Sequence, residues 1–203
     1  ERAMQTLYTA DYNAGWQHQI AYVLDTLAAN DAPVVDLACG RGYLVEQFVA
    51  QSPRPIIASD FSPRVLRRNR AAWRSTGFAD QVSLLAFDAR CTPFRDAVIS
   101  TMTTNLGLPN IQQPGPLLEE LGRVIDGSLL AIQHFYPPDD DANAAAIREH
   151  DLEPFMFAHT AEAHFRRAGW TVNFANAVTT NAEPTPTGEI IPSGIDGLPV
   201  TAT

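Results

Sequence analysis

Residues 34–44 are Val34-Val35-Asp36-Leu37-Ala38-Cys39-Gly40-Arg41-Gly42-Tyr43-Leu44. The apolar run over 32–37 predicts a buried strand, and the pattern from Tyr43 to Gln51 predicts a helix. Glycine between them allows a positive φ and a close backbone approach to a ligand. The start of the helix adds exposed N–H groups, which favour an anionic or polar ligand. The same pattern also fits a tight strand–helix turn that binds nothing.

Outward from this turn, short β-branched runs alternate with helical stretches. This alternation is typical of a parallel sheet with helices on both faces, and so of an α/β fold. Ser62, Pro63 and Gly77 predict the N-cap, first residue and end of one helix, and Thr160 and Gly169 predict the limits of another. Further strands are expected over residues 55–59, 82–87, 97–102, 129–132 and 170–178, and a further helix over residues 117–124.

Three aspartates follow three consecutive strands of this predicted sheet. Asp36 closes the first strand, Asp60 the second and Asp88 the third. Ligands of open α/β sheets bind outside the carboxyl ends of the strands, so these carboxylates are expected along one binding edge. A carboxylate after the second strand is the usual acceptor for the ribose hydroxyls of an adenosine-containing cofactor.

These residues resemble the signature of class I S-adenosylmethionine-dependent methyltransferases. The resemblance rests on DLACGRG at 36–42, on Asp60 after IIAS, and on Phe87-Asp88-Ala89, and it covers about residues 30 to 178. It extends to LEELGRV at 118–124. It implies a Rossmann-like, doubly wound, mostly parallel sheet with an antiparallel last strand, formed by one methyltransferase domain over residues 1–203.

The resemblance also implies which residues bind S-adenosylmethionine. The residue that matches Asp60 holds the ribose, the one that matches Asp88 reaches the adenine amino group, and Phe61 packs on the adenine. The turn wraps the methionine part. Ala38 stands where the family often has glycine, and alanine is small enough to be tolerated. The positions expected at the cofactor are Asp36, Ala38, Cys39, Gly40, Gly42, Asp60, Phe61, Asp88, Ala89 and Thr104.

Two other functions stay open. An NAD(P)-dependent oxidoreductase would use a similar turn, but its first glycine is replaced by Ala38, and such turns rarely carry an acid at the position of Asp36. A cofactor-binding regulatory protein without catalysis is the second alternative.

The methyl acceptor is expected near two further segments at the same edge. Asn105 follows the fourth strand in a run, residues 103–110, that is not the Asn/Asp-Pro-Pro-Tyr motif of base or amide methyltransferases. His134 follows the fifth strand and is a candidate base because imidazole titrates near neutral pH. Either residue could instead be structural, Asn105 as a turn residue and His134 as a packed histidine.

Two outer segments are predicted to border the site. The Pro- and Gly-rich residues 184–199 are expected to form a loop at the active-site edge, and residues 1–30 a helical lid that carries Tyr8, Tyr12 and Trp16. These aromatic side chains could equally pack on the sheet.

The composition narrows the chemistry further. The net charge is −9, and all 14 basic residues are arginine. Without lysine, Schiff-base chemistry and the lysine-dependent forms of phosphoryl transfer are excluded. The acidic balance argues against nucleic acid and favours a neutral or cationic small molecule, or another protein, as the partner; a small-molecule acceptor is the one expected here. The two cysteines form no metal or disulfide pattern, and no membrane-spanning run or signal peptide is apparent, so a cytoplasmic protein without a metal is expected.

Overall fold

The computed structural model describes residues 9–29, 31–51 and 54–180. The chain divides into two compact units. One is Asn30–Val172, and the other combines the end segments Glu1–Ala29 and Asn173–Thr203.

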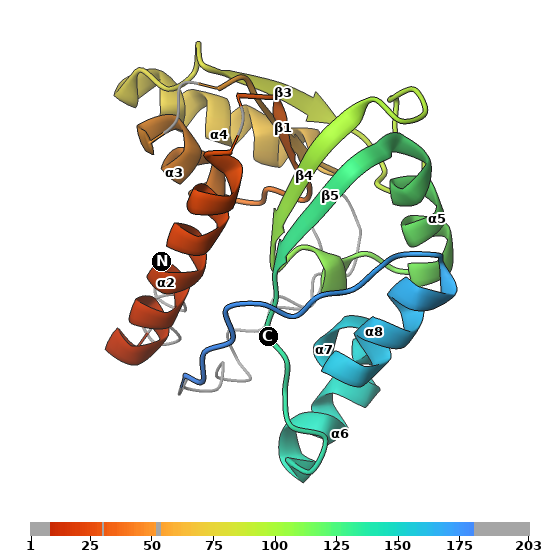
Figure 1. Ribbon diagram of the computed structural model, residues 1–203. Coiled ribbons are helices and arrows are strands. Elements are labelled where there is room, and N and C mark those ends of the chain that lie inside the picture. Colours follow the sequence, from red (N-terminus) through yellow and green to blue (C-terminus); the bar gives the residue numbers. More distant parts are fainter. Residues whose placement is uncertain (1–8, 30, 52–53, 181–203) are drawn as a thin grey trace. The chain divides into compact units, whose positions relative to one another are not determined.

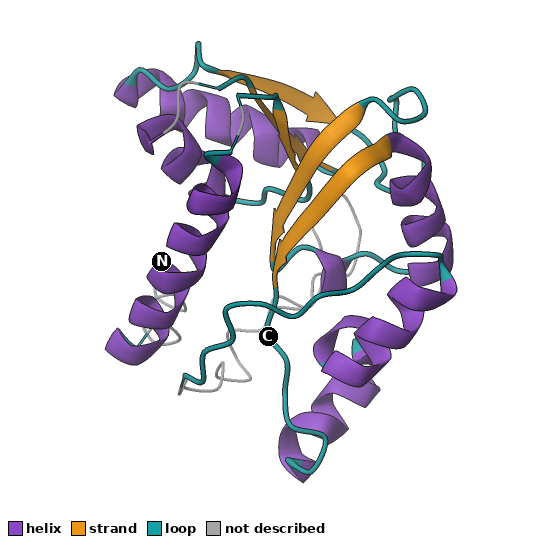
Figure 2. Ribbon diagram, viewed as in Figure 1, coloured by secondary structure: helices purple, strands orange, loops and turns teal. Residues whose placement is uncertain are grey.

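The larger unit is built on a five-stranded sheet (Figure 2). Its strands lie in the order β3-β2-β1-β4-β5, and every neighbouring pair is parallel. The predicted α/β, Rossmann-like fold is therefore confirmed. The strands are β1 (Val34–Asp36), β2 (Ile56–Asp60), β3 (Val82–Ala86), β4 (Ile99–Asn105) and β5 (Ile125–Ile132).

The strand order reverses between β1 and β4. The chain runs outward from β1 through β2 to β3 and then returns to the other side of β1. Asp36 at the end of β1 lies beside Ala58 of β2 and Thr103 of β4. Ligands of doubly wound sheets bind at such a switch point, outside the carboxyl ends of the strands. The turn that follows Asp36 starts at this point.

Helices connect the strands and cover the sheet (Figure 1). Helices α3 and α4 contact β2, and α5 contacts β5 and α8. The buried face of α5 consists of Leu117, Leu118, Leu121 and Val124, as its sequence pattern predicts for the first three. The helices of this unit are α3 (Tyr43–Gln51), α4 (Pro63–Thr76), α5 (Pro114–Val124), α6 (Asp141–Glu149), α7 (Glu153–Met156) and α8 (Ala158–Arg167), with a 3-10 turn at Leu108–Asn110.

Helix α4 begins and ends where its sequence predicts. The side chain of Ser62 accepts a hydrogen bond from the backbone N–H of Val65, and Pro63 is the first helical residue. Gly77 ends the helix in the left-handed region at φ 78°. Capping of both ends fixes the direction in which α4 leaves β2.

Several predicted boundaries were wrong, among them the start of β5, which begins at Ile125, and two helices were not predicted. Strand β4 continues to Asn105, because residues 103–105 pair with residues 130–132 of β5. Helix α8 begins at Ala158, and Thr160 does not cap it, because its hydroxyl donates to the carbonyls of Glu153 and Phe157. Helices α6 and α7 were not predicted, although Asp140 accepts from the backbone N–H of Asn143 as an N-cap of α6.

The predicted sixth strand, residues 170–178, is not a strand in the structure. After Gly169 (φ 87°) the indole of Trp170 donates to the carbonyl of Leu118 over 3.2 Å and packs edge-on against Phe165. These contacts hold Trp170 to α5 and α8, and the segment pairs with no strand of the described sheet. The described residues contain no antiparallel strand in the sheet, and the predicted last strand and loop, residues 184–203, lie outside them.

The smaller unit contains α2 (Ala10–Leu27), whose N-cap Thr9 accepts from the backbone N–H of Tyr12 over 3.1 Å. Gln19 donates to the carbonyl of Asn176, and Asn176 donates to the carbonyl of His18, so α2 and residue 176 are tied together. Tyr12 and Trp16 lie on α2, whereas Tyr8 is outside the described residues, and the lid stays a prediction. None of the helices in the described ranges is long and apolar enough to cross a membrane.

Candidate functional site

The turn after β1 is held in a conformation that needs small residues. Ala38 and Gly40 both have φ 51°, and Gly42 has φ 81°. The backbone N–H of Cys39 donates to the carbonyl of Ser59 on β2 over 2.8 Å, and that of Gly42 donates to the carbonyl of Cys39 over 2.8 Å. The turn is therefore fastened to the neighbouring strand, and a Cβ at Gly40 would meet nothing within 4 Å.

Helix α4 supports the turn from the side. A Cβ on Gly42 would come within 2.2 Å of the indole of Trp73, which is buried and donates to Glu46 over 2.8 Å. The side chain of Asn69, also buried, donates to the carbonyl of Gly40 over 2.7 Å. Sequence reasoning missed Asn69. Its signal is that it is the one polar residue at a position of α4 where the helical spacing otherwise puts the apolar residues Val65, Leu66 and Trp73.

Asp60, at the end of β2, binds two backbone donors. One carboxylate oxygen accepts from the N–H of Gly40 and the other from the N–H of Ser62, each over 2.9 Å. A carboxylate offers about four acceptor positions, so each oxygen retains one for another donor. Asp60 thus links the turn to the start of α4 and still presents two acceptor positions.

Asp36 is a buried carboxyl group at the switch point. The residue is 1% exposed, and one of its oxygens accepts from the hydroxyl of Thr103 over 2.7 Å. Burial, opposed by this hydrogen bond and assisted by the nearby charge of Asp60, raises the pKa of Asp36 to about 7. Burial also raises the pKa of the Cys39 thiol, which therefore stays neutral. The structure brings Asp36 and Asp60 together as predicted.

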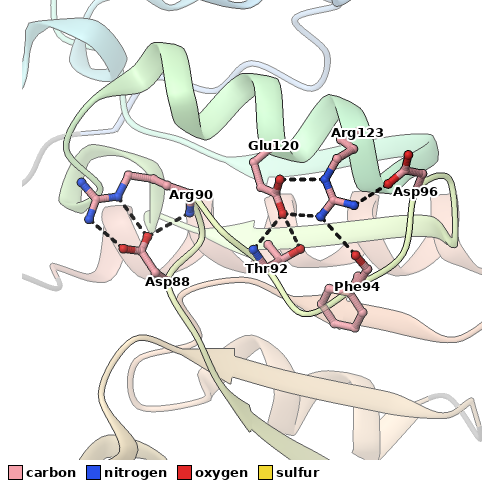
Figure 3. Close-up of polar contacts among 7 residues, drawn as sticks. All are labelled: Asp88, Arg90, Thr92, Phe94, Asp96, Glu120 and Arg123. Atoms are coloured by element: carbon pink, nitrogen blue, oxygen red, sulfur yellow. Dashed lines mark hydrogen bonds and ion pairs between the residues drawn. The ribbon is translucent and has the colours of Figure 1, made fainter.

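Asp88 follows β3 and is held by an arginine (Figure 3). One carboxylate oxygen accepts from the backbone N–H and the Nε of Arg90, over 2.9 and 3.0 Å, and the other accepts from Nη2 over 2.7 Å. These hydrogen bonds are the main reason why the pKa of Asp88 is lowered. Sequence reasoning missed Arg90, whose position two residues after an aspartate is the signal for such a pair.

The segment after Arg90 is fastened to α5 (Figure 3). The backbone N–H and the hydroxyl of Thr92 both donate to Glu120 over 2.7 Å. Arg123 donates to both oxygens of Glu120, over 2.8 and 2.6 Å, and also to Asp96 and the carbonyl of Phe94. The hydrogen bonds, chiefly that of Arg123, lower the pKa of Glu120 to about 2. This network fixes the loop that carries Asp88.

The remaining expected cofactor residues differ in exposure. Phe61, next to Asp60, is 46% exposed and offers a ring surface to a ligand. Ala89 is buried in the core. Thr104 is fully buried, and its hydroxyl donates to the carbonyl of Leu37 over 2.8 Å, so it supports the turn from beneath.

The two residues expected at the methyl acceptor lie at neighbouring strand ends. Asn105 is the last residue of β4, and His134 is half-buried two residues after β5. Burial lowers the pKa of His134, so its imidazole is neutral at neutral pH. Beside it, Gln133 donates to the carbonyl of Phe155 over 3.0 Å, while its buried Oε1 accepts no hydrogen bond within the described part of the chain.

The described residues include no cluster of three or more His, Cys, Asp or Glu that could hold a metal ion. The polar groups of the site are instead single carboxylates spaced along three neighbouring strand ends. This arrangement suits an extended organic cofactor with several separate polar groups.

Known proteins share the part of the chain that contains the turn after β1. Residues 34–127 match a family model described as a methyltransferase domain. The chain is similar to the demethylmenaquinone methyltransferase of Thermobifida fusca (strain YX), with 35% identity over 119 residues, 56% of this chain and 50% of that protein. It is also 29% identical over 108 residues to the ubiquinone/menaquinone biosynthesis C-methyltransferase UbiE of Pectobacterium carotovorum subsp. carotovorum (strain PC1), covering 52% of this chain and 43% of that protein.

The chain thus spans about half the length of the curated relatives it matches. Its fold is similar to that of geranyl diphosphate C-methyltransferase from Streptomyces coelicolor A3(2), solved in complex with Mg2+, geranyl diphosphate and S-adenosyl-L-homocysteine. The TM-score is 0.58 at 16% identity, over 79% of this chain and 65% of that chain. With the sheet order and the turn in agreement, residues 34–127 belong to the class I S-adenosylmethionine-dependent methyltransferase family.

Proposed function

We propose that the protein transfers a methyl group from S-adenosylmethionine to a small-molecule acceptor by in-line displacement. The observation that carries this proposal is the carboxylate of Asp60, held by the N–H groups of Gly40 and Ser62. Its two remaining acceptor positions, one on each oxygen, match the two hydroxyls of a ribose. The open space at Gly40 fits the backbone approach of a ligand.

The cofactor supplies a sulfonium methyl group whose leaving group is already activated, so the protein mainly aligns the reactants and excludes water. Asp60 holds the ribose and Asp88 the adenine amino group. Phe61 packs on the adenine ring, and the turn from Ala38 to Gly42 receives the methionine part. These roles follow from the family resemblance and are supported by the placement of the side chains at consecutive strand ends.

For the acceptor we propose a ring carbon of a hydroxylated aromatic compound. Two relatives carry names that specify methylation in quinone biosynthesis, one of them as a C-methyltransferase. The unpartnered Oε1 of Gln133 supports an acceptor that brings a hydroxyl or N–H donor to the end of β5. His134, neutral at neutral pH, is the candidate base that takes the proton of the ring hydroxyl as the ring carbon attacks the methyl group. S-adenosylhomocysteine leaves, and the hydrogen on the methylated carbon is released as a proton when the aromatic ring is restored.

Calorimetric titration with S-adenosylhomocysteine and, separately, with NAD tests the cofactor. We expect binding of S-adenosylhomocysteine alone. Binding of NAD alone would favour the oxidoreductase and refute the proposal.

A second experiment tests catalysis. Incubation with methyl-labelled S-adenosylmethionine and a demethylated naphthoquinol should yield a labelled product in which the new carbon is attached to the ring, identified by mass spectrometry. The matched reaction with a naphthoquinol already methylated at that carbon should give none. Cofactor binding without label transfer to any of a panel of phenols, quinols and amines would favour the non-catalytic regulator.

A further inference from the structure

Arg90 almost saturates the carboxylate of Asp88. Its backbone N–H and Nε donate to Oδ1 over 2.9 and 3.0 Å, and its Nη2 donates to Oδ2 over 2.7 Å (Figure 3). Oδ1 therefore receives two donors and Oδ2 receives one. Since each carboxylate oxygen offers about two acceptor positions, a single position remains, on Oδ2.

Arg90 is itself held in place. Its Nη1 donates to the side chain of Gln113, which precedes α5, over 3.2 Å. The backbone closes around the pair as well, because the N–H of Cys91 donates to the carbonyl of Asp88 over 2.9 Å. The next residue, Thr92, is bound to Glu120 by two hydrogen bonds. Arg90 thus orients the carboxylate of Asp88, and three further contacts hold Arg90 and the backbone around it.

A carboxylate in a fixed orientation with one open acceptor position binds only a donor that approaches from one direction. It matches one N–H of an exocyclic amino group and repels a carbonyl oxygen at the same place. A carboxylate free to rotate would also accept the ring N–H of a 6-oxopurine. The orientation of Asp88 therefore determines the difference in binding affinity between ligands that carry adenine and ligands that carry hypoxanthine.

We propose that Arg90 is a positioning residue that orients Asp88 toward the 6-amino group of the cofactor's adenine and thereby sets the preference for an adenosyl over an inosyl ligand. The proposal rests on the proposed function, since it needs a nucleoside cofactor at this edge of the sheet. Arg90 acts only through Asp88 and makes no contact of its own with the ligand.

The test is the ratio of two dissociation constants, measured by calorimetry with S-adenosylhomocysteine and S-inosylhomocysteine. A hydrogen bond to a charged group corresponds to roughly a tenfold to hundredfold change in affinity, so the wild type should prefer the adenosyl ligand by about that factor. Arg90→Met should reduce the preference to within about threefold. Arg90→Lys, which keeps a charged donor but not the planar two-point geometry of the guanidinium, should restore part of it.

Two controls separate positioning from general damage. Arg166→Met removes an exposed arginine–carboxylate pair on α8, with Glu162, and should leave the ratio unchanged. Asp88→Asn replaces the acceptor and should abolish the preference by itself.

The outcomes are distinct. Equal loss of affinity for both ligands in Arg90→Met would make Arg90 a merely structural residue and overturn the proposal, as would an unchanged ratio. If the wild type binds both ligands equally, the role of Asp88 at the adenine and the positioning role of Arg90 are both refuted. The proposed use of S-adenosylmethionine would not be affected by that result. If the wild type binds neither ligand, the proposed function itself fails.

Discussion

The backbone N–H of Gly40 donates to the carboxylate of Asp60 over 2.9 Å and so joins the turn after β1 to the end of β2. The second oxygen of Asp60 joins the same point to the start of α4 through Ser62. One side chain thus shapes the turn and offers a binding surface at once. Its replacement is expected to affect cofactor binding more than folding, because the turn has further ties to Ser59 and Asn69.

Replacing Asp60 by alanine should weaken the binding of S-adenosylhomocysteine by about 1–3 kcal/mol, the cost of polar groups left without partners. Calorimetric titration measures this change. Asp80→Ala, on an exposed loop, is the control and should bind like the wild type. Unchanged affinity in Asp60→Ala would refute the ribose role.

Most of the sheet could be predicted from the sequence because its signals are local. Buried β-branched runs predicted all five strands, and Ser62, Pro63 and Gly77 predicted the limits of α4. Each of these features depends on the chemistry of a few adjacent residues. The aspartates at the strand ends could be predicted for the same reason, since strand position and residue type are both visible.

What could not be predicted depends on contacts between distant residues. Residues 170–178 have the composition of a strand, yet Trp170 is bound to Leu118 and Phe165 and starts no strand. Likewise, Asn69 donates to the carbonyl of Gly40 and Arg90 donates to the side chain of Gln113, and only the folded chain brings these partners near. A single sequence contains no signal for which of two possible partners a side chain will choose.

Gly42 is expected to be less tolerant of substitution than Gly40. Both have a positive φ, so alanine is strained at either position. Only at Gly42 would the Cβ meet Trp73, at 2.2 Å, whereas Gly40 faces open space. Gly42→Ala should therefore lower the free energy of unfolding by about 2–4 kcal/mol, and Gly40→Ala by about 1–2 kcal/mol. Urea unfolding measures both, and equal losses would contradict the packing role of Trp73.

Glu120 is predicted to stabilise the loop that carries Asp88. Glu120→Gln leaves Arg123 with a weaker acceptor and should lower the free energy of unfolding by about 1–3 kcal/mol at pH 7. The pKa of Glu120 is lowered from 4.5 to about 2 in the folded protein. Its contribution is therefore present above pH ~4.5 and is lost as the pH falls toward ~2.

The difference between wild type and Glu120→Gln should accordingly shrink when urea unfolding is repeated at low pH. Glu162→Gln, in the exposed pair with Arg166, is the matched control and should change the free energy of unfolding by at most about 0.5 kcal/mol. A loss of the same size in both variants would show that the Thr92–Glu120–Arg123 network adds nothing beyond a surface ion pair.

Asp36 is expected to make the protein less stable as the pH rises. Its pKa is about 7 when folded, against 3.8 for the unperturbed group, so the folded state binds more protons than the unfolded state between these values. Stability then falls as the pH rises toward 7, because the unfolded chain releases this proton readily while burial and the charge of Asp60 keep it on Asp36 in the folded protein. Asp36→Asn removes the titration and keeps an oxygen to accept from Thr103.

The measurement is the difference in free energy of unfolding between Asp36→Asn and the wild type, followed by urea unfolding from pH 5 to pH 8. Between pH 5 and pH 8 the free energy of unfolding of the variant, relative to that of the wild type, should increase by about 1–3 kcal/mol, since one pKa unit corresponds to about 1.4 kcal/mol. Thr103→Val removes the hydrogen bond that lowers this pKa, so its loss of stability should continue to higher pH than that of the wild type and be larger over the whole range. Parallel curves for wild type and Asp36→Asn would mean that Asp36 ionises in the folded protein as easily as in water, and its burial at the switch point would then not affect its charge.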